Sequence, residues 1–320
     1  MASSQEKLSN MRFFCGSSHP ELGQSIASKL GVEVGQMELS QFSCGELFAN
    51  IQESIRGFEV YILQTCGPQV NRDLMELFII MDALKRCSAA HIHVIMPHFG
   101  YARQDKKAGP REPITSRLVA DLLDAVGLDR VLTMDLHAGQ IQGFFSVPVD
   151  HLTAMPLFIN YFQTKHLPNL VVVAPDAGRA KFAKKMSDRL GGDLAFMHKT
   201  RPGHNKAEIT HVVGDVKDKT VLLIDDMVDT GGSVTNGIQM LRDQGCKEDI
   251  YLATTHGVFS GPAFDRLSAA GFKEVVVTDT IPIPEEKRFP GLHILSVADM
   301  FAEAIRRNHT RESISSLYEC

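Results

Sequence analysis

Short apolar runs alternate with helical patterns along most of this chain, and this alternation restricts its fold more than any other feature. The runs are rich in β-branched residues, which is typical of buried strands. The predicted strands are Met11–Cys15, Phe58–Leu63, His91–Met96, Arg130–Met134, Leu170–Ala174, Leu194–Met197, Thr220–Ile224, Ile250–Ala253, Glu274–Thr278 and Leu292–Val297. Strands that alternate with helices in this way indicate an α/β fold, with parallel sheets covered by helices on both faces.

The segments between the strands carry apolar residues three and four positions apart, as amphipathic helices do. One such helix covers Leu74–Leu84, with Asn71 as the expected N-cap. A second is expected to end at Gly127, and its apolar positions are Ile114, Leu118, Leu122 and Val126.

The length of 320 residues favours two domains, each large enough for its own core. The two halves have a similar order of strands and helices. In addition, Val131–Asp135 resembles Val221–Asp225, since both are apolar strands that end in Asp before a turn. The interpretation that we prefer is two related α/β domains, with the boundary near residues 150–160.

The stretch from Val221 to Ser233 has the pattern of a phosphate site. A buried strand leads to Asp225 and Asp226, and a Thr-Gly-Gly-Ser turn at residues 230–233 precedes a helical run. Free backbone N–H groups and the positive end of a helix dipole favour an anion at such a turn. The carboxylates suit sugar hydroxyls, or a metal beside the phosphate. The alternative is an ordinary strand–turn–helix crossover with acidic loop residues.

A cationic stretch, Tyr101–Lys107, follows the strand His91–Met96, and Arg111 lies just beyond it. Arg and Lys in a loop are what a polyphosphate requires, although a solvated charged loop would look the same. A second cationic stretch, His198–Lys206, also contains Pro and Gly. It indicates a mobile lid that closes over an anionic substrate, with a surface loop as the alternative.

Two further polar groups follow predicted strands, at the edge where open α/β sheets collect ligands. His137 comes two residues after a strand that ends in Asp135, and Gln140 and Gln142 lie nearby. A lone His in this position is more often structural. Asp176 follows the strand Leu170–Ala174, which is a reasonable position for Mg²⁺ or pyrophosphate.

Composition excludes several other classes. The net charge of −5 gives no indication of general nucleic-acid binding. The six cysteines lack C-x-x-C spacing, which indicates reduced thiols rather than disulfides or a zinc site. The N-terminal ten residues contain no apolar signal segment, and the apolar runs are too short to span a membrane. The sequence therefore predicts a cytoplasmic protein that binds neither nucleic acid nor membrane.

At this point the sequence resembles a known family, ribose-phosphate diphosphokinase, also called phosphoribosyl-pyrophosphate synthetase. The resemblance is collinear from about Phe13 to Tyr318, and the run Asp135–Asp150 looks like the family signature. The stretch Val221–Ser233 looks like the phosphoribosyl-diphosphate loop, which phosphoribosyltransferases share. Further motifs that agree lie at residues 42–46, 71–77, 101–107 and 302–307.

The resemblance implies the fold of two phosphoribosyltransferase-like domains and a reaction. ATP would transfer its β,γ-diphosphoryl group to the C1 hydroxyl of ribose 5-phosphate, with Mg²⁺ on the polyphosphate, giving phosphoribosyl pyrophosphate and AMP. The implied domains are residues 10–154, on which residues 305–320 would pack, and residues 155–304, which carry the ribose 5-phosphate loop. Dimers assembled into a hexamer would be the implied assembly.

The resemblance also implies roles for individual residues. Catalysis would depend on Lys199 and Arg201. Ribose 5-phosphate would be bound by Arg201, Asp225, Asp226, Asp229, Thr230, Gly231, Gly232 and Ser233. ATP would be bound by Arg103 and Gln104, and by Phe42, Cys44, Gly45 and Glu46 reaching across from a neighbouring subunit. The metal ligands would be His137 and Asp176. Phosphate and ADP, as effectors, would use a regulatory site that includes Ser54, Arg56, Gln142, Asp150, Ser313 and Ser315.

The sequence departs from the family pattern at a few of these positions. Cys44 stands where Asp or Asn is usual, and a thiol is a weak hydrogen-bonding partner. Arg179 stands where a second Gly is usual, Ser146 replaces a usual Asp, and Gly139 and His151 replace a common Ser and a common Asn. Two other functions stay open: a salvage phosphoribosyltransferase, and a catalytically silent subunit that regulates active synthetases.

Overall fold

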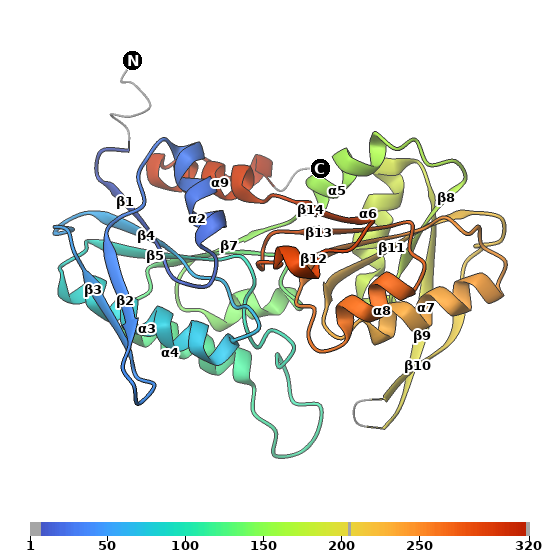
Figure 1. The fold of residues 1–320 in the computed structure, drawn as a ribbon, viewed down its shortest axis with the longest axis horizontal. Coiled ribbons are helices and arrows are strands. Elements are labelled where there is room, and N and C mark those ends of the chain that lie inside the picture. Colours follow the sequence, from blue (N-terminus) through green and yellow to red (C-terminus); the bar gives the residue numbers. More distant parts are fainter. Residues whose placement is uncertain (1–7, 204–205, 318–320) are drawn as a thin grey trace. The chain divides into compact units, whose positions relative to one another are not determined.

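The computed structural model describes the backbone of residues 8–203 and 206–317, with their side chains except those of residues 177 and 198–210. The chain divides into two compact units (Figure 1). Unit 1 comprises residues 1–153, 280–282 and 296–320, and unit 2 comprises residues 154–279 and 283–295. Each unit is built around one mainly parallel sheet with helices on both faces, so the predicted α/β fold class is confirmed.

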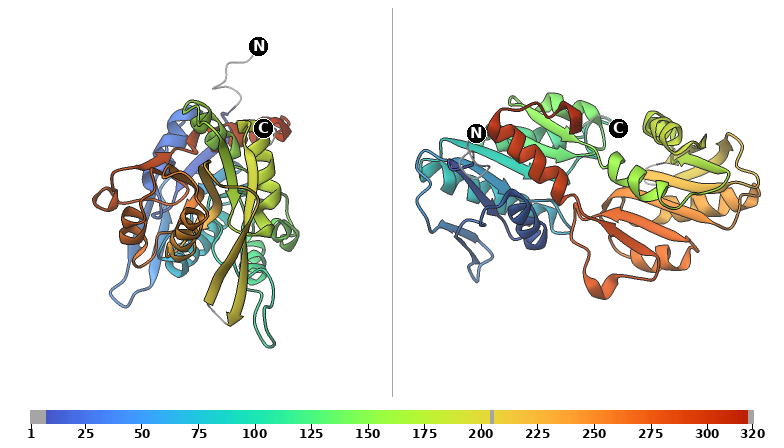
Figure 2. Two further views of the ribbon diagram at one scale, coloured as in Figure 1. Left: turned by 90° about the vertical axis from the view of Figure 1, so that its right-hand side faces the viewer. Right: turned by 90° about the horizontal axis from the view of Figure 1, so that it is seen from above.

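Unit 1 contains a five-stranded parallel sheet in the order β1-β4-β5-β6-β7 and a separate two-stranded hairpin. The sheet strands are β1 (Met11–Cys15), β4 (Glu59–Leu63), β5 (His91–Met96), β6 (Arg130–Met134) and β7 (Val149–Leu152). The hairpin strands are β2 (Met37–Gln41) and β3 (Leu47–Ile51). The helices are α2 (Pro20–Leu30), α3 (Val70–Arg86), α4 (Thr115–Val126) and α9 (Ala298–Thr310), with the 3-10 helices η1 (Gly139–Phe144) and η4 (Ser315–Leu317). Helices α2 and α9 lie together on one face of the sheet, and α3 and α4 cover the other (Figures 1 and 2).

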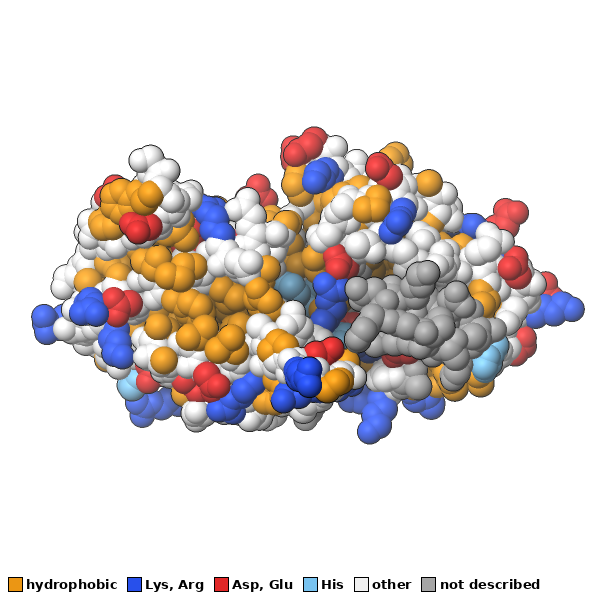
Figure 3. Space-filling view, turned by 90° about the horizontal axis from the view of Figure 1, so that it is seen from below, with side chains coloured by type: hydrophobic (Ala, Val, Ile, Leu, Met, Phe, Trp, Pro, Cys, Tyr) orange, Lys and Arg blue, Asp and Glu red, His pale blue; other side chains and the backbone are white. Residues whose placement is uncertain are grey.

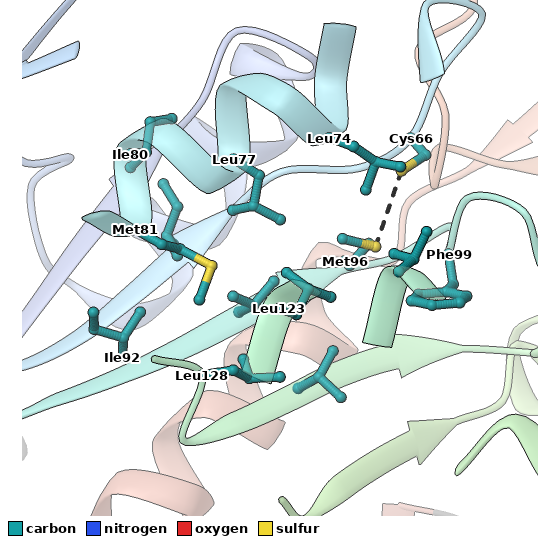
Figure 4. Close-up of a cluster of buried hydrophobic side chains, with 14 of the residues drawn as sticks. Cys66, Leu74, Leu77, Ile80, Met81, Ile92, Met96, Phe99, Leu123 and Leu128 are labelled. Atoms are coloured by element: carbon teal, nitrogen blue, oxygen red, sulfur yellow. Dashed lines mark hydrogen bonds between the residues drawn. The ribbon is translucent and has the colours of Figure 1, made fainter. Parts of the chain in front are cut away.

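The main core of unit 1 lies between its sheet and the pair α3–α4 (Figure 4). Leu77 of α3, Ile92 of β5 and Leu123 of α4 are buried in it. Each side chain of this size stabilises the fold by roughly 1.5–3 kcal/mol when it leaves water. Cys66 is fully enclosed, with its sulfur 4.0 Å from that of Met96, and burial raises the pKa of its thiol to about 12. This cysteine therefore remains a protonated, unreactive core residue.

Helix α9 is joined to unit 1 by buried polar contacts, although the two are far apart in the sequence. The Tyr61 hydroxyl donates to Asn308 Oδ1 at 2.9 Å, and Asn308 Nδ2 donates to Asp150 Oδ2 at 3.3 Å. His309 Nδ1 lies 2.9 Å from Glu59 Oε2. Because buried polar groups are costly without partners, these contacts make α9 a required part of unit 1.

Unit 2 contains a seven-stranded sheet in the order β10-β9-β8-β11-β12-β13-β14, in which only the β9–β10 pair is antiparallel. Its strands are β8 (Leu170–Ala174), β9 (Asp193–Gly203), β10 (Lys206–Val213), β11 (Thr220–Val228), β12 (Ile250–Gly257), β13 (Glu274–Thr278) and β14 (Leu292–Leu295). Its helices are α5 (Met155–Gln163), α6 (Ala180–Leu190), α7 (Gly232–Asp243) and α8 (Ala263–Ala269), with the 3-10 helices η2 (Ala177–Arg179) and η3 (Glu285–Lys287).

The central strands of unit 2 are apolar on both faces, as parallel strands between two helical layers must be. All five residues of β8 are buried. Val171 and Leu223 belong to the core beneath α7 and α8, where they join Ile238 and Leu267. Helices α5 and α6 pack against each other beside β8.

Every predicted strand is present, with shifts at some ends. The strand predicted to stop at Ile224 continues to Val228, because Asp225 and Met227 pair with Thr254 and His256 of β12. The two carboxylates therefore lie within a strand rather than after it. Strands β2, β3, β7 and β10 had not been predicted.

Two predictions about helices are wrong in detail. Asn71 does not cap α3, which begins at Val70 after Gln69. The Asn71 side chain instead accepts a hydrogen bond from the Tyr101 hydroxyl. Its oxygen is therefore used in a contact with another loop and not as a helix cap.

The apolar stripe of α4 is not its buried face. Leu118 and Leu122 are 53% and 42% exposed, and Ile114, just before the helix, is 36% exposed. The buried face instead carries Ser116, Val119, Ala120 and Leu123, of which Val119 and Leu123 pack in the core. Together with Met75 of α3 the exposed side chains form a hydrophobic patch, which we call the α3–α4 patch; hydrophobic side chains gather on this side of unit 1 in Figure 3.

Across the described ranges, none of the helices combines the length and the hydropathy needed to cross a bilayer. The described cysteines are all free thiols.

Candidate active site

The carboxylates of β11 lie near the C-terminal end of the central strand of unit 2, where parallel sheets collect ligands. Asp225 Oδ1 accepts a hydrogen bond from the backbone N–H of Asp226 at 2.9 Å. Asp226 is 5% exposed, and its Oδ2 forms an ion pair with the guanidinium of Arg179. Both carboxylates are thus held in defined orientations.

The turn after β11 leads directly into helix α7. Gly231 has φ of 76° and is the N-cap residue of α7, a conformation that a residue with a Cβ rarely adopts. Within the described part of the chain, no side chain caps this helix start. The N-terminal N–H groups of α7 therefore face the turn, as a phosphate-binding helix requires.

Arg266 of α8 braces the same turn and had not been predicted. Its Nη1 donates to the backbone oxygen of Thr230 at 3.0 Å, while Ser260 N–H donates to the oxygen of Asp229 at 3.0 Å. No sequence pattern marks Arg266, because its role depends on a contact between elements that are distant in the chain.

The loop after β8 carries Asp176 at the same edge of the unit 2 sheet, since β8 and β11 are neighbouring parallel strands. Asp176 Oδ1 accepts hydrogen bonds from the N–H groups of Gly178 at 2.9 Å and Arg179 at 3.3 Å. These bonds orient the carboxylate without using all of its acceptor capacity.

The stretch predicted to be a lid loop forms a β-hairpin. β9 continues through Arg201 to Gly203 and pairs with β10, with Lys199 opposite Ile209 (Figure 1). The backbone of this stretch is thus paired in an antiparallel sheet. Pro202 lies near the strand end, where a missing N–H is tolerated. The side chains of Lys199 and Arg201 lie outside the described part of the structure.

In unit 1 the loops after β5 and β6 are joined to each other. Arg103 and Gln104 are exposed, and the backbone oxygen of Gln104 accepts from Ser116 Oγ at the start of α4, at 2.9 Å. Buried Asp105 accepts a hydrogen bond from Gln140 Nε2 at 2.7 Å. The predicted ATP residues and the signature run are therefore brought to one edge of this sheet.

His137 is exposed at the end of a strained turn. Asp135 has φ of 36°, which is unusual for a residue with a side chain. Its N–H donates to the oxygen of Leu152 at 3.0 Å, and the next N–H, of Leu136, donates to His151 Nε2 at 2.8 Å. His151 thus holds the turn that presents His137, a role that its sequence position gave no reason to expect.

The remaining predicted ATP residues occupy the tip of the β2–β3 hairpin. Phe42 is 55% exposed and meets Phe48 edge to face at 6.0 Å between ring centroids. Gly45 has φ of 98° and closes the turn, and Cys44 and Glu46 are exposed beside it. The hairpin projects from the sheet of unit 1 (Figure 1).

The predicted regulatory residues have different environments. Asp150 is buried and paired with Arg130 Nη1 at 3.0 Å, and burial raises its pKa even though Arg130 opposes the shift. Ser313 and Ser315 are bonded to each other through their hydroxyls at 3.2 Å in the segment after α9. The other members are exposed: Ser54, Arg56 and Gln142.

The described side chains contain no group of three or more metal-binding residues. Asp176 and His137 belong to different units, so each unit offers a single predicted ligand. The Asp176 carboxylate is a ligand of the type that Mg²⁺ takes, because this ion usually binds one or two carboxylates and completes its shell with water and substrate phosphates.

Parallel sheets with a carboxylate-bearing strand and an uncapped helix start define an α/β protein with a phosphate-binding edge. Comparison with known proteins identifies it further. A family model for the N-terminal domain of ribose phosphate pyrophosphokinase matches residues 11–127, and one for the phosphoribosyl synthetase-associated domain matches residues 200–319. The chain belongs to the ribose-phosphate pyrophosphokinase family, as the sequence had predicted.

The relatives match over almost the full chain. A ribose-phosphate pyrophosphokinase from Clostridium perfringens is 49% identical over 314 residues, covering 97% of this chain and 98% of the relative. One from Synechococcus elongatus is 50% identical over 314 residues, covering 96% and 93%. The crystal structure of phosphoribosylpyrophosphate synthetase from Mycobacterium smegmatis has a TM-score of 0.90 at 47% identity, covering 94% of this chain and 99% of that chain.

Proposed function

We propose that this chain transfers the diphosphoryl group of ATP to the C1 hydroxyl of ribose 5-phosphate, giving phosphoribosyl pyrophosphate and AMP. The observation that carries the proposal is the end of β11, where two oriented carboxylates precede the uncapped start of α7. A sugar phosphate suits this arrangement, because the carboxylates accept from its hydroxyls while the helix start takes its phosphate.

In this proposal the acceptor binds to unit 2. Asp225 and Asp226 hold the ribose hydroxyls, and residues 229–233 hold the 5-phosphate. Arg266 supports the phosphate turn through its bond to the oxygen of Thr230. Lys199 and Arg201, on β9, neutralise charge on the transferred group, since phosphoryl transfer depends mainly on positioning and charge stabilisation.

ATP is proposed to bind at the edge of unit 1 that carries Arg103 and Gln104. The exposed hairpin tip, with Phe42, Cys44, Gly45 and Glu46, is proposed to line the adenine pocket of a neighbouring subunit. Exposed aromatic rings at a projecting tip support this assignment, because Phe42 and Phe48 remain 55% and 40% exposed in the described structure.

We propose Mg²⁺ as the metal, with Asp176 and His137 as its protein ligands. Bound Mg²⁺ would neutralise charge on the polyphosphate. Asp176 suits this task, because its Oδ1 is oriented by two N–H groups.

We also propose a homo-oligomer, dimers assembled into a hexamer, in the cytoplasm. The α3–α4 patch supports it, because a monomer rarely exposes such a patch without a use. Phosphate and ADP are proposed as effectors at the site that includes Ser54, Arg56, Gln142, Asp150, Ser313 and Ser315.

The decisive assay measures AMP formation by purified protein from ATP and ribose 5-phosphate with Mg²⁺, with no added base. AMP in equal amount to phosphoribosyl pyrophosphate is the expected result. No AMP would indicate a silent subunit, and nucleotide formation only from phosphoribosyl pyrophosphate and an added base, with release of pyrophosphate, would indicate a salvage transferase. The same assay with phosphate and ADP added tests the effector site.

The role of Lys199 is tested by Lys199→Ala, which we expect to lower kcat by roughly 10²-fold or more, as loss of an electrostatic stabiliser does. Lys217→Ala, an exposed lysine of the same unit, is the matched control and should keep the parent's turnover. Equal turnover of Lys199→Ala and the parent at saturating substrates would remove Lys199 from the reaction.

A further inference from the structure

Arg179 connects the two segments that form the ligand edge of unit 2. It lies at the junction of η2 and α6, three residues after Asp176, and its guanidinium pairs with Asp226 of β11. The side chains are 19% and 3% exposed, respectively. This ion pair therefore lies largely out of water, and its acidic member is one of the two predicted sugar-binding carboxylates.

The pair stabilises the Asp226 carboxylate. A carboxylate that is shielded from water is costly to bury without an oppositely charged partner, and Arg179 supplies one. The planar guanidinium also directs the carboxylate, because it bonds only along its own N–H directions.

The neighbouring carboxylate is oriented differently. Asp225 accepts from the backbone N–H of Asp226 at 2.9 Å, so its orientation follows from the strand itself. Asp226, in contrast, also pairs with a side chain from another loop. A substitution at Arg179 removes that ion pair and leaves the backbone bond to Asp225 in place.

We propose that Arg179 is a positioning residue for ribose 5-phosphate, which keeps the Asp226 carboxylate aimed at the sugar hydroxyls. This inference rests on the proposed role of Asp226 in the function above. In this proposal Arg179 acts through Asp226 rather than on the transferred diphosphoryl group or the nucleotide.

The test compares Arg179→Gln, Arg179→Lys, Asp226→Asn and the double variant Arg179→Gln/Asp226→Asn in the full chain. Initial rates at varied ribose 5-phosphate and varied ATP give both KM values and kcat. Arg179→Gln should raise KM for ribose 5-phosphate between about tenfold and about a hundredfold, the effect of losing a charge-assisted hydrogen bond. KM for ATP should stay within about twofold of the parent.

Two further results identify the route through Asp226. Arg179→Lys should recover most of the lost affinity, because it restores the charge although not the planar geometry. In the Asp226→Asn background, Arg179→Gln should add little, since residues that act as one unit are not additive. Arg189→Gln, an exposed arginine of α6, is the matched control and should change neither KM.

The outcomes separate this inference from the function on which it rests. If Asp226→Asn raises KM for ribose 5-phosphate while Arg179→Gln does not, the sugar site stands and the role of Arg179 is refuted. Fully multiplicative effects in the double variant, or an equal rise in KM for ATP, would also refute it, because Arg179 would then act on the phosphates directly. If Asp226→Asn itself leaves KM unchanged, the sugar-site assignment fails as well.

Discussion

Burial of His93 makes the stability of unit 1 depend on pH below neutrality. This residue of β5 is 8% exposed, its ring stacks on that of Tyr61 at 4.6 Å between centroids, and its Nδ1 has no hydrogen-bond partner within the described chain. Burial lowers its pKa from 6.5 to about 4, although Glu59 opposes the shift. The folded protein therefore holds the imidazole neutral where the unfolded chain would protonate it.

The magnitude follows from the two pKa values. Because the folded pKa is the lower one, the unfolded state binds the extra proton, so stability is complete above the unfolded pKa of 6.5 and falls as pH decreases towards 4. At about 1.4 kcal/mol per pKa unit, the loss approaches roughly 3 kcal/mol at pH 4 and is about 2 kcal/mol at pH 5.

The perturbation is His93→Phe, which keeps the ring against Tyr61 and removes the titration. Urea unfolding followed by far-UV circular dichroism at pH 8 and pH 5 gives the free energy of unfolding of each protein. The loss between the two pH values should be about 2 kcal/mol smaller in the variant than in the parent. His91→Phe is the matched control, because His91 lies on the same strand but is exposed, and it should keep the parent's pH dependence.

Comparison of the two proteins removes the contributions of other groups that titrate over this range. An equal loss of stability in His93→Phe and the parent would show that His93 is protonated in the folded state, and the argument from its burial would be wrong. The same conclusion would follow if His91→Phe reduced the loss as much as His93→Phe.

Three other outcomes can be checked directly. His151→Phe leaves the buried Leu136 N–H without its acceptor, so the free energy of unfolding in urea should fall by about 1–3 kcal/mol, whereas His151→Gln, which retains an acceptor, should lose less. Asp176→Asn removes a charge from the proposed metal site, so the Mg²⁺ concentration for half-maximal activity should rise by about tenfold or more; an unchanged requirement would exclude Asp176 as a ligand. Leu118→Glu together with Leu122→Glu places charges in the α3–α4 patch, so the oligomer should dissociate in sedimentation velocity, and an unchanged mass would remove the patch from the interface.

The strands that sequence predicted best are those whose environment is uniform. Leu170–Ala174 is buried on both faces, so its composition alone indicates a central parallel strand. The missed strand β2 has partly buried and exposed positions, and the missed strand β7 has partly buried and buried positions. Both contain polar residues, such as Glu38, Gln41 and Asp150. They form because a partner strand is available, which a local pattern does not reveal.

The orientation of α4 shows a second limit. Leu118 and Leu122 are spaced as a core stripe should be, yet the smaller residues on another face, such as Val119 and Ala120, pack inward. Two apolar faces compete on this helix, and the space beside the sheet decides between them. Periodicity gives the helix but does not identify which face the protein buries.

In the candidate site, functional residues could be predicted from the sequence where they lie together in one segment. Asp225, Asp226 and the Gly231 turn follow one another in the sequence, so a phosphate loop could be predicted. The contacts made by Arg266, His151 and Arg179 join segments that only the tertiary structure brings together. Their roles depend on partners, and no single-segment pattern contains that information.

The attachment of α9 to unit 1 has a consequence for how the protein is made. A nascent chain that has released residues 1–153 from the ribosome already contains Tyr61, Glu59 and Asp150, but not the helix whose Asn308 and His309 bind them. All of unit 2 is therefore translated before unit 1 can close against α9. During that interval the side chains that bind α9 lack these partners, and a chain that stops before α9 never acquires them.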